Sequence, residues 1–216
     1  MNMIPNRELL SMAYNLRAFD IEQGAWPHES EGFEANAQHA LEHLASDMVT
    51  KNFNDEDTIL REIAPDALSF ALRLNRWADL KPVENGNPDE TPLGRTRSTV
   101  LELRPHYGDL ETSHIAYIGA VGTLASHLRD LRHPDKRELA QTARPEVVRN
   151  TASLLQYCVE QQMKWLGFNY RSVFHLRLRS LRDELGIPQP KGVPDEPITD
   201  AVYDSLRSLD PEFINW

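Results

Sequence analysis

The chain is poor in cysteine and has no long hydrophobic run. Its 216 residues include a single cysteine, Cys158, which excludes a disulfide scaffold and a cysteine-based zinc site. No apolar stretch approaches the roughly 20 residues that a membrane-spanning helix requires. Residues 1–19 also lack the uninterrupted apolar centre of a signal peptide. These absences predict a cytoplasmic protein that does not enter a membrane.

Signatures of common active sites are missing as well. The sequence contains no glycine-rich phosphate loop, no Gly-x-Ser-x-Gly nucleophile elbow and no Cys–His pair with local support. It also contains no internal repeat and no low-complexity tract. We therefore predict no cofactor and assign no catalytic residue from the sequence.

The chain does carry a helical hydrophobic pattern. Hydrophobic residues make up 40% of it and charged residues 26%, as in globular proteins, and its length suits one domain. Apolar side chains recur every three or four residues along most segments, which is typical of amphipathic helices. The pattern predicts an all-α fold, a bundle of six to eight helices over residues 1–186. The expected helices span residues 5–19, 30–52, 55–63, 65–80, 109–131, 134–143, 145–167 and 169–185.

Glycine and proline mark the exceptions to this pattern. Residues 81–95 hold three prolines and two glycines and are predicted to form a loop. Residues 96–103 show a two-residue alternation that suggests a β-strand. Gly119 and Gly122 lie inside an expected helix, where each costs about 1 kcal/mol relative to alanine. We expect a neighbouring helix to approach closely at these two glycines.

Residues 187–216 form a C-terminal arm of different composition. Prolines space its first part, and Thr199 can cap one short helix. The arm ends with Phe213, Ile214 and Trp216, and burying each of these side chains stabilises by about 1.5–3 kcal/mol. We therefore expect the arm to dock through them, either on the basic segment described next or on a second subunit of a homo-oligomer.

One short segment is purely basic, although the whole chain has a net charge of −10. Residues 161–182 carry five lysine and arginine side chains and no carboxylate. In the helix expected at 169–185, basic side chains recur every three or four residues beside a separate apolar stripe. The basic residues are Lys164, Arg171, His175, Arg179 and Arg182, and the neighbouring aromatic residues are Trp165, Phe168 and Tyr170.

This basic segment has two interpretations. Arginine donates two parallel hydrogen bonds to a phosphate or carboxylate, and exposed aromatic rings stack on bases, so the segment is a candidate site for nucleic acid or an acidic protein. Alternatively, its arginines pair with glutamates of other helices and its aromatic residues belong to the core. The binding interpretation predicts that Arg171, Arg179 and Arg182 face solvent and form no intramolecular ion pairs.

A second cluster lies in the helix expected at 30–52. His39, His43 and Asp47 are spaced by four, which places three potential metal ligands on one side of a helix. The zinc-protease pattern requires a glutamate directly after its first histidine, but Ala40 follows His39. We therefore interpret these histidines as helix-surface residues and predict no metal site.

These observations favour a non-catalytic, cytoplasmic binding or regulatory protein that engages an anionic partner through residues 171–182. One alternative is a small helical hydrolase, either ribonuclease-like or metal-dependent. It would use an Arg/His pair one helical turn apart, or the His/Asp cluster. The other alternative is a structural subunit of an oligomer, held together by the C-terminal arm.

Overall fold

The computed structural model describes residues 6–23, 32–80 and 109–189. In these ranges the chain forms helices and turns without a β-strand, which confirms the predicted all-α class. Residues 96–103 and the arm residues Phe213, Ile214 and Trp216 lie outside the described ranges. No described helix is long and apolar enough to cross a membrane. The elements are α1 (Asn6–Gln23), α2 (Gly32–Thr50), α3 (Glu56–Thr58), the π-helix η2 (Ile59–Ile63), α4 (Ala64–Trp77), α6 (Asp109–Arg132), α7 (Arg137–Leu166) and α8 (Tyr170–Glu184).

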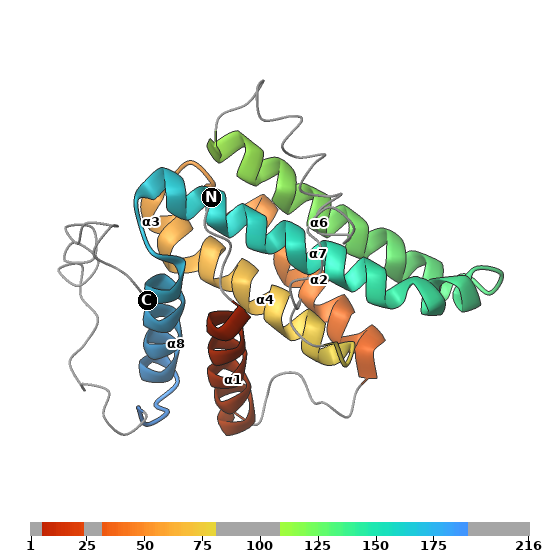
Figure 1. Cartoon of the computed structure of the whole chain (residues 1–216), viewed down its shortest axis with the longest axis horizontal. Coiled ribbons are helices and arrows are strands. Elements are labelled where there is room, and N and C mark those ends of the chain that lie inside the picture. Colours follow the sequence, from red (N-terminus) through yellow and green to blue (C-terminus); the bar gives the residue numbers. More distant parts are fainter. Residues whose placement is uncertain (1–5, 24–31, 81–108, 190–216) are drawn as a thin grey trace.

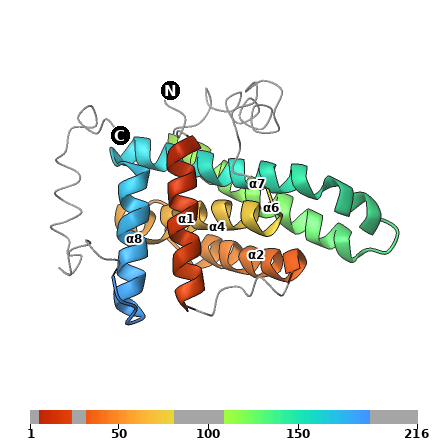
Figure 2. The same ribbon diagram turned by 60° about the horizontal axis from the view of Figure 1, so that its bottom comes forward.

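Helix α4 runs through the centre of the bundle (Figure 1). It packs most extensively against α7 and also contacts α1, α2 and α8. Helices α6 and α7 form an antiparallel hairpin, with α2 against α6. Helices α1 and α8 lie side by side and cross the other helices at a steep angle (Figure 2).

The sequence of α4 explains its central position. Residues 64–75 are all buried except Asp66, so the helix has no fully solvent-exposed side along this length. A helix with this distribution belongs in a core rather than on a surface. A buried hydroxyl is satisfied locally, because Ser69 Oγ donates to the carbonyl oxygen of Pro65 at 2.7 Å. The helix therefore enters the core without leaving this polar group unpaired.

The helices predicted at 55–63 and 65–80 are one continuous element. Asp55 caps α3, because its Oδ2 accepts from the amide of Thr58 at 2.8 Å. The chain continues as the π-helix η2, where the amide of Ala64 donates to the carbonyl oxygen of Ile59, five residues earlier. Pro65 lies at the junction of η2 and α4 and does not interrupt the element.

A second predicted boundary, between residues 143 and 145, is absent from α7. The sequence predicts one helix that ends near Ala143 and another that begins at Pro145, whereas α7 continues through Pro145. Proline lacks the amide that would bond to the carbonyl of Gln141, but Gln141 is exposed, so water can satisfy that carbonyl. Helix α7 ends as predicted at Gly167, which adopts a positive φ of 75°.

A buried ion cluster joins α1 to α4. Asp20 accepts hydrogen bonds from Arg73 at 2.6 and 3.2 Å and from Arg76 at 2.8 Å. The Asp20 side chain is only 3% exposed. Helix α1 is therefore held by charge as well as by its buried apolar residues, which are Met12, Leu16 and Phe19.

Candidate ligand pocket

A tight turn between α2 and α3 builds one wall of a pocket. The amide of Asn54 donates to the side-chain oxygen of Asn52 at 3.1 Å, and the amide of Asp55 donates to the Asn52 carbonyl oxygen, also at 3.1 Å. Asp55 Oδ2 accepts from both the amide and the hydroxyl of Thr58, which hold the pKa of this carboxyl below its usual value. These bonds fix the backbone on both sides of Phe53, and the turn carries that side chain into the core.

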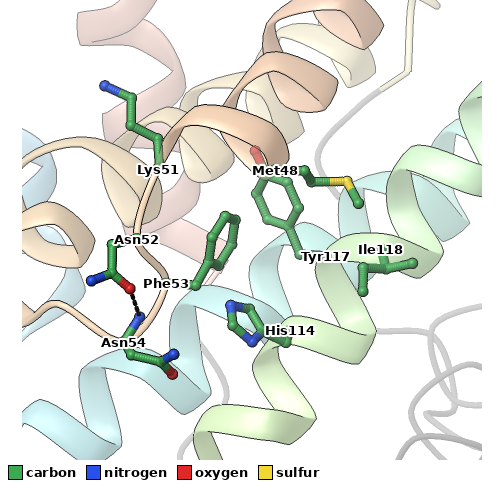
Figure 3. Close-up of a pocket in the computed structure, with 8 residues that line it drawn as sticks. All are labelled: Met48, Lys51, Asn52, Phe53, Asn54, His114, Tyr117 and Ile118. Carbon is green, nitrogen blue, oxygen red and sulfur yellow. Dashed lines mark hydrogen bonds between the residues drawn. The ribbon is translucent and has the colours of Figure 1, made fainter.

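Phe53 lies between two aromatic side chains of α6. Its ring centroid is 4.4 Å from that of His114 and 5.0 Å from that of Tyr117, which it meets edge-on. The three rings form the floor of a cavity of about 310 Å³ (Figure 3). The lining residues are Met48, Lys51, Asn52, Phe53, Asn54, His114, Tyr117 and Ile118.

The pocket has a polar end and an apolar end. Figure 3 shows Asn52 and Asn54 on one side of the aromatic rings and Met48 and Ile118 on the other. All four side chains belong to exposed residues, so a ligand can reach them from solvent. The geometry suits a molecule that places a flat face on the rings and a hydrogen-bonding edge against the amides.

The pocket presents little net charge. The ammonium group of Lys51 pairs with the carboxylate of Glu62 on η2, and its side chain extends away from the aromatic rings (Figure 3). Burial lowers the pKa of His114, against the smaller opposing effect of Glu111. The imidazole is therefore neutral at neutral pH. With one cation paired and the histidine neutral, the site favours an uncharged ligand.

The π-helix η2 supports the Lys51 side of the pocket. Single π turns are rare and occur frequently at functional sites. Here the turn buries Ile59, Leu60 and Ile63 in the core while Glu62 holds Lys51. The irregular helix therefore fixes one edge of the pocket to the centre of the bundle.

Two carboxyl groups with raised pKa values, those of Asp47 and Asp66, interact electrostatically with Tyr117. The hydroxyl of Tyr117 donates to Asp47 Oδ2 at 3.3 Å. Burial raises the pKa of Asp47, although this hydrogen bond and nearby cations favour the charged form. Burial also raises the pKa of Asp66 to about 6, and the charge of Asp47 contributes to that shift. Tyr117 is thus oriented by a carboxylate that is not freely solvated.

The basic segment predicted from the sequence does not form one exposed surface. Arg182 is only 6% exposed and pairs with Glu22 of α1 at 2.5 Å. It also donates to the carbonyl oxygen of Pro188 at 3.0 Å, and its guanidinium lies over the ring of Phe19. The prediction that Arg182 faces solvent is therefore wrong, because α1 packs beside α8 and supplies the carboxylate that pairs with it.

The other residues of the segment are divided between surface and interior. Lys164 and Trp165 are exposed near the end of α7. Phe168 is 8% exposed and belongs to the core, so the prediction that it stacks on a base is wrong. The side chain of Arg171 lies outside what the structure describes. The partly buried members are Tyr170, His175 and Arg179.

The structure does not bring His39, His43 and Asp47 together as metal ligands. The two imidazole rings meet edge-on with centroids 4.9 Å apart, whereas Asp47 is buried against Tyr117. Among residues 6–23, 32–80 and 109–189, no group of three or more potential ligands is placed to hold a metal ion. The geometry gives these histidines no shared ligand position with Asp47.

Comparison with protein-family models, curated proteins and solved structures finds no match for the chain. None of the residues that line the pocket was predicted from the sequence to be a site residue. Two signals point to them. Residues 52–55 read Asn-Phe-Asn-Asp, a turn composition interrupted by an aromatic side chain. His114 and Tyr117 are three apart, so they share a helix face.

Proposed function

We propose that the chain is a non-catalytic binding protein for a small, uncharged, planar heteroaromatic molecule, of the size of a nucleobase. The observation that carries the proposal is the cluster of the Phe53, His114 and Tyr117 rings beside the exposed amides of Asn52 and Asn54. Aromatic floors bind flat ring systems, and side-chain amides both donate and accept at a heterocycle's edge.

The size of the cavity supports a ligand of this class. Its volume of about 310 Å³ is near the lower end of the range for small-molecule sites. Met48 adds a polarisable thioether, which makes favourable contacts with aromatic rings. One or two fused rings occupy such a space, whereas a long polymer or a large cofactor does not.

The geometry gives less support to an anionic partner at the basic segment. Arg182 is committed to Glu22, and Arg177 donates to Glu184 at 3.1 Å. The buried position of Phe168 removes one of the three proposed stacking residues. A binding protein remains the favoured class, but the ligand and the surface differ from those expected from the sequence.

Thermal melts with a compound panel test the proposal. The panel pairs uncharged purine and pyrimidine bases with their nucleoside monophosphates and with aliphatic amides. A ligand at 100 times its Kd stabilises by about 2.7 kcal/mol, which corresponds to a rise in Tm of roughly 5–10 °C for a chain of this size. We expect such shifts for uncharged heteroaromatic compounds only.

Two matched variants locate the binding site. Ile118→Glu places a carboxylate at the mouth of the pocket, and Val49→Glu makes the same change at a residue that is 85% exposed and does not line it. The first variant should abolish the ligand shift and the second should retain it. Equal shifts in both variants, or a preference for the monophosphates, would show that the proposed pocket is not the site.

A further inference from the structure

A second and larger hollow lies on the hairpin of α6 and α7, separate from the ligand pocket. It is a groove of about 770 Å³ between the outer halves of the two helices. Figure 2 shows that the tip of the hairpin extends past the ends of α2 and α4, while Phe33 of α2 contacts His127 and Arg144 of the hairpin. The groove is lined by Gly119, Gly122, Thr123, Ser126, His127, Asp130, Lys136, Leu139, Ala140, Ala143 and Val147.

The floor of the groove consists mainly of small residues. On α6 the positions 119, 122, 123 and 126 form one stripe, and Ala140 and Ala143 of α7 face it across the groove. A Cβ at Gly119 would touch Leu154 at 3.5 Å, an ordinary contact, whereas a Cβ at Gly122 would meet no atom within 4 Å. The close helix approach expected from Gly122 is therefore not made by any described residue.

A buried histidine provides an independent indication of a missing partner. His127 lines the same groove, is 5% exposed, and its Nε2 has no hydrogen-bond partner among the described residues. Burial and the charge of Arg144 lower the pKa of His127, so the ring is neutral. A buried polar atom left without a hydrogen bond costs about 1–3 kcal/mol, and a hydroxyl from a docked surface would remove this cost.

The groove presents both a protruding apolar side chain and an open space of matching size. Leu139 at its edge is 74% exposed, while Gly122 and Ala143 leave space for a side chain of that size. The charges on this face are balanced, because Lys136 pairs with Asp130 at 3.5 Å. A two-fold interface requires one surface to fit itself, and a charge-balanced face avoids the repulsion expected between copies with a net charge of −10.

We propose that this groove is the interface of a homodimer, in which the α6–α7 hairpins of two copies pack face to face. Leu139 of each copy occupies the space over Gly122 and Ala143 of the other. Ser126 accepts from Arg129 in its own chain and keeps its hydroxyl proton, so Ser126 of the second copy can donate to His127 Nε2 once the imidazole, whose Nε2 is closed to solvent in the single chain, turns toward the groove. This interface goes beyond the proposed ligand function and differs from an oligomer held by the C-terminal arm.

Solution mass measured by light scattering over a wide range of protein concentration tests the dimer. The full chain should approach twice 24.7 kDa at high concentration. Gly122→Leu fills the space that the partner's Leu139 requires and should weaken dimerisation by at least about tenfold, or 1.4 kcal/mol. It should not destabilise the monomer, because position 122 is open and leucine favours helix. The matched control is Gln141→Leu, at an exposed position of the same hairpin outside the groove.

Cross-linking provides a second, geometric measurement. Gly122→Cys copies mixed with Leu139→Cys copies bring two thiols together across the proposed interface and should form an intermolecular disulfide under mild oxidation. Gln141→Cys should not, and the native Cys158 is buried, with a pKa raised by burial, so it will not compete. A monomeric full chain, or a dimer that survives Gly122→Leu but is lost on truncation after Gly186, would overturn the proposal.

Discussion

The buried ion cluster at Asp20 gives the sharpest quantitative test of the packing. Asp20→Ala removes three hydrogen bonds from Arg73 and Arg76. The Arg73 side chain is only 9% exposed and would keep its charge in a buried site after losing its carboxylate, whereas Arg76 at 21% can turn toward water. Breaking a buried pair in this way costs about 3–5 kcal/mol. Because one of the two arginines can be resolvated, we expect a loss near the lower limit, about 3 kcal/mol.

Urea and thermal unfolding at neutral pH measure this loss. For a chain of this length a loss of about 3 kcal/mol lowers Tm by roughly 6–12 °C. Asp20→Asn keeps the shape and one accepting oxygen, so it should lose less than Asp20→Ala. The matched control is Asp57→Ala, because the Asp57 side chain is 78% exposed and lies 4.0 Å from Arg61. An exposed pair of this kind contributes no more than about 0.5 kcal/mol.

The refuting result is equal stability of the Asp20→Ala and Asp57→Ala variants. That outcome would mean that α1 is held by its apolar face alone and that Asp20 is solvated in solution. A loss confined to the unfolding of α1, seen as a separate early transition, would support the ion cluster but show that α1 unfolds independently of the bundle.

The remaining predictions concern pH, capping and the basic helix. The pKa of Asp66 is raised from 3.8 to about 6, so this group stabilises the fold at low pH, and its contribution is lost as pH rises from about 4 through 6. Asp66→Asn should remove that part of the pH dependence in urea midpoints. Asp55→Ala should cost about 1 kcal/mol in thermal melts through loss of the α3 cap. Arg182→Glu should destabilise markedly, because it places a second acid beside Glu22 in a buried site, whereas Lys164→Glu, at an exposed position, should change stability by less than about 0.5 kcal/mol.

The hydrophobic period predicted most of the fold, because most helices bury a regular face. The segment at 109–131 matches α6, and the stop near residue 186 agrees with Gly186, whose φ is +66°. The period does not predict how proline behaves in a particular helix. Pro145 lies inside α7 because the carbonyl it leaves unpaired is exposed and the following turns are buried. That choice depends on tertiary packing rather than on the local sequence.

The site was less predictable than the fold, because it joins segments that are distant in the sequence. Phe53 meets His114 and Tyr117 across some 60 residues, and no local spacing records that contact. The same reason explains the error at Arg182. Asp183 and Glu184 follow Arg182 in the sequence, but after folding Arg182 pairs with Glu22 of α1. Spacing shows which side chains share a helix face, but it does not show which helix covers that face.

Helix α6 lines both the ligand pocket and the groove. His114, Tyr117 and Ile118 line the ligand pocket, and the groove begins at Gly119, the next residue of the same helix. If the proposed dimer forms, any ligand that shifts or stiffens α6 will act on a dimer contact at Gly122, only one turn from Ile118. By thermodynamic linkage, a ligand that strengthens dimerisation by some factor must itself bind the dimer more tightly than the monomer by the corresponding factor. The apparent ligand affinity would then depend on protein concentration. The fraction of chain with ligand bound would therefore vary with the concentration of the chain as well as with that of the ligand.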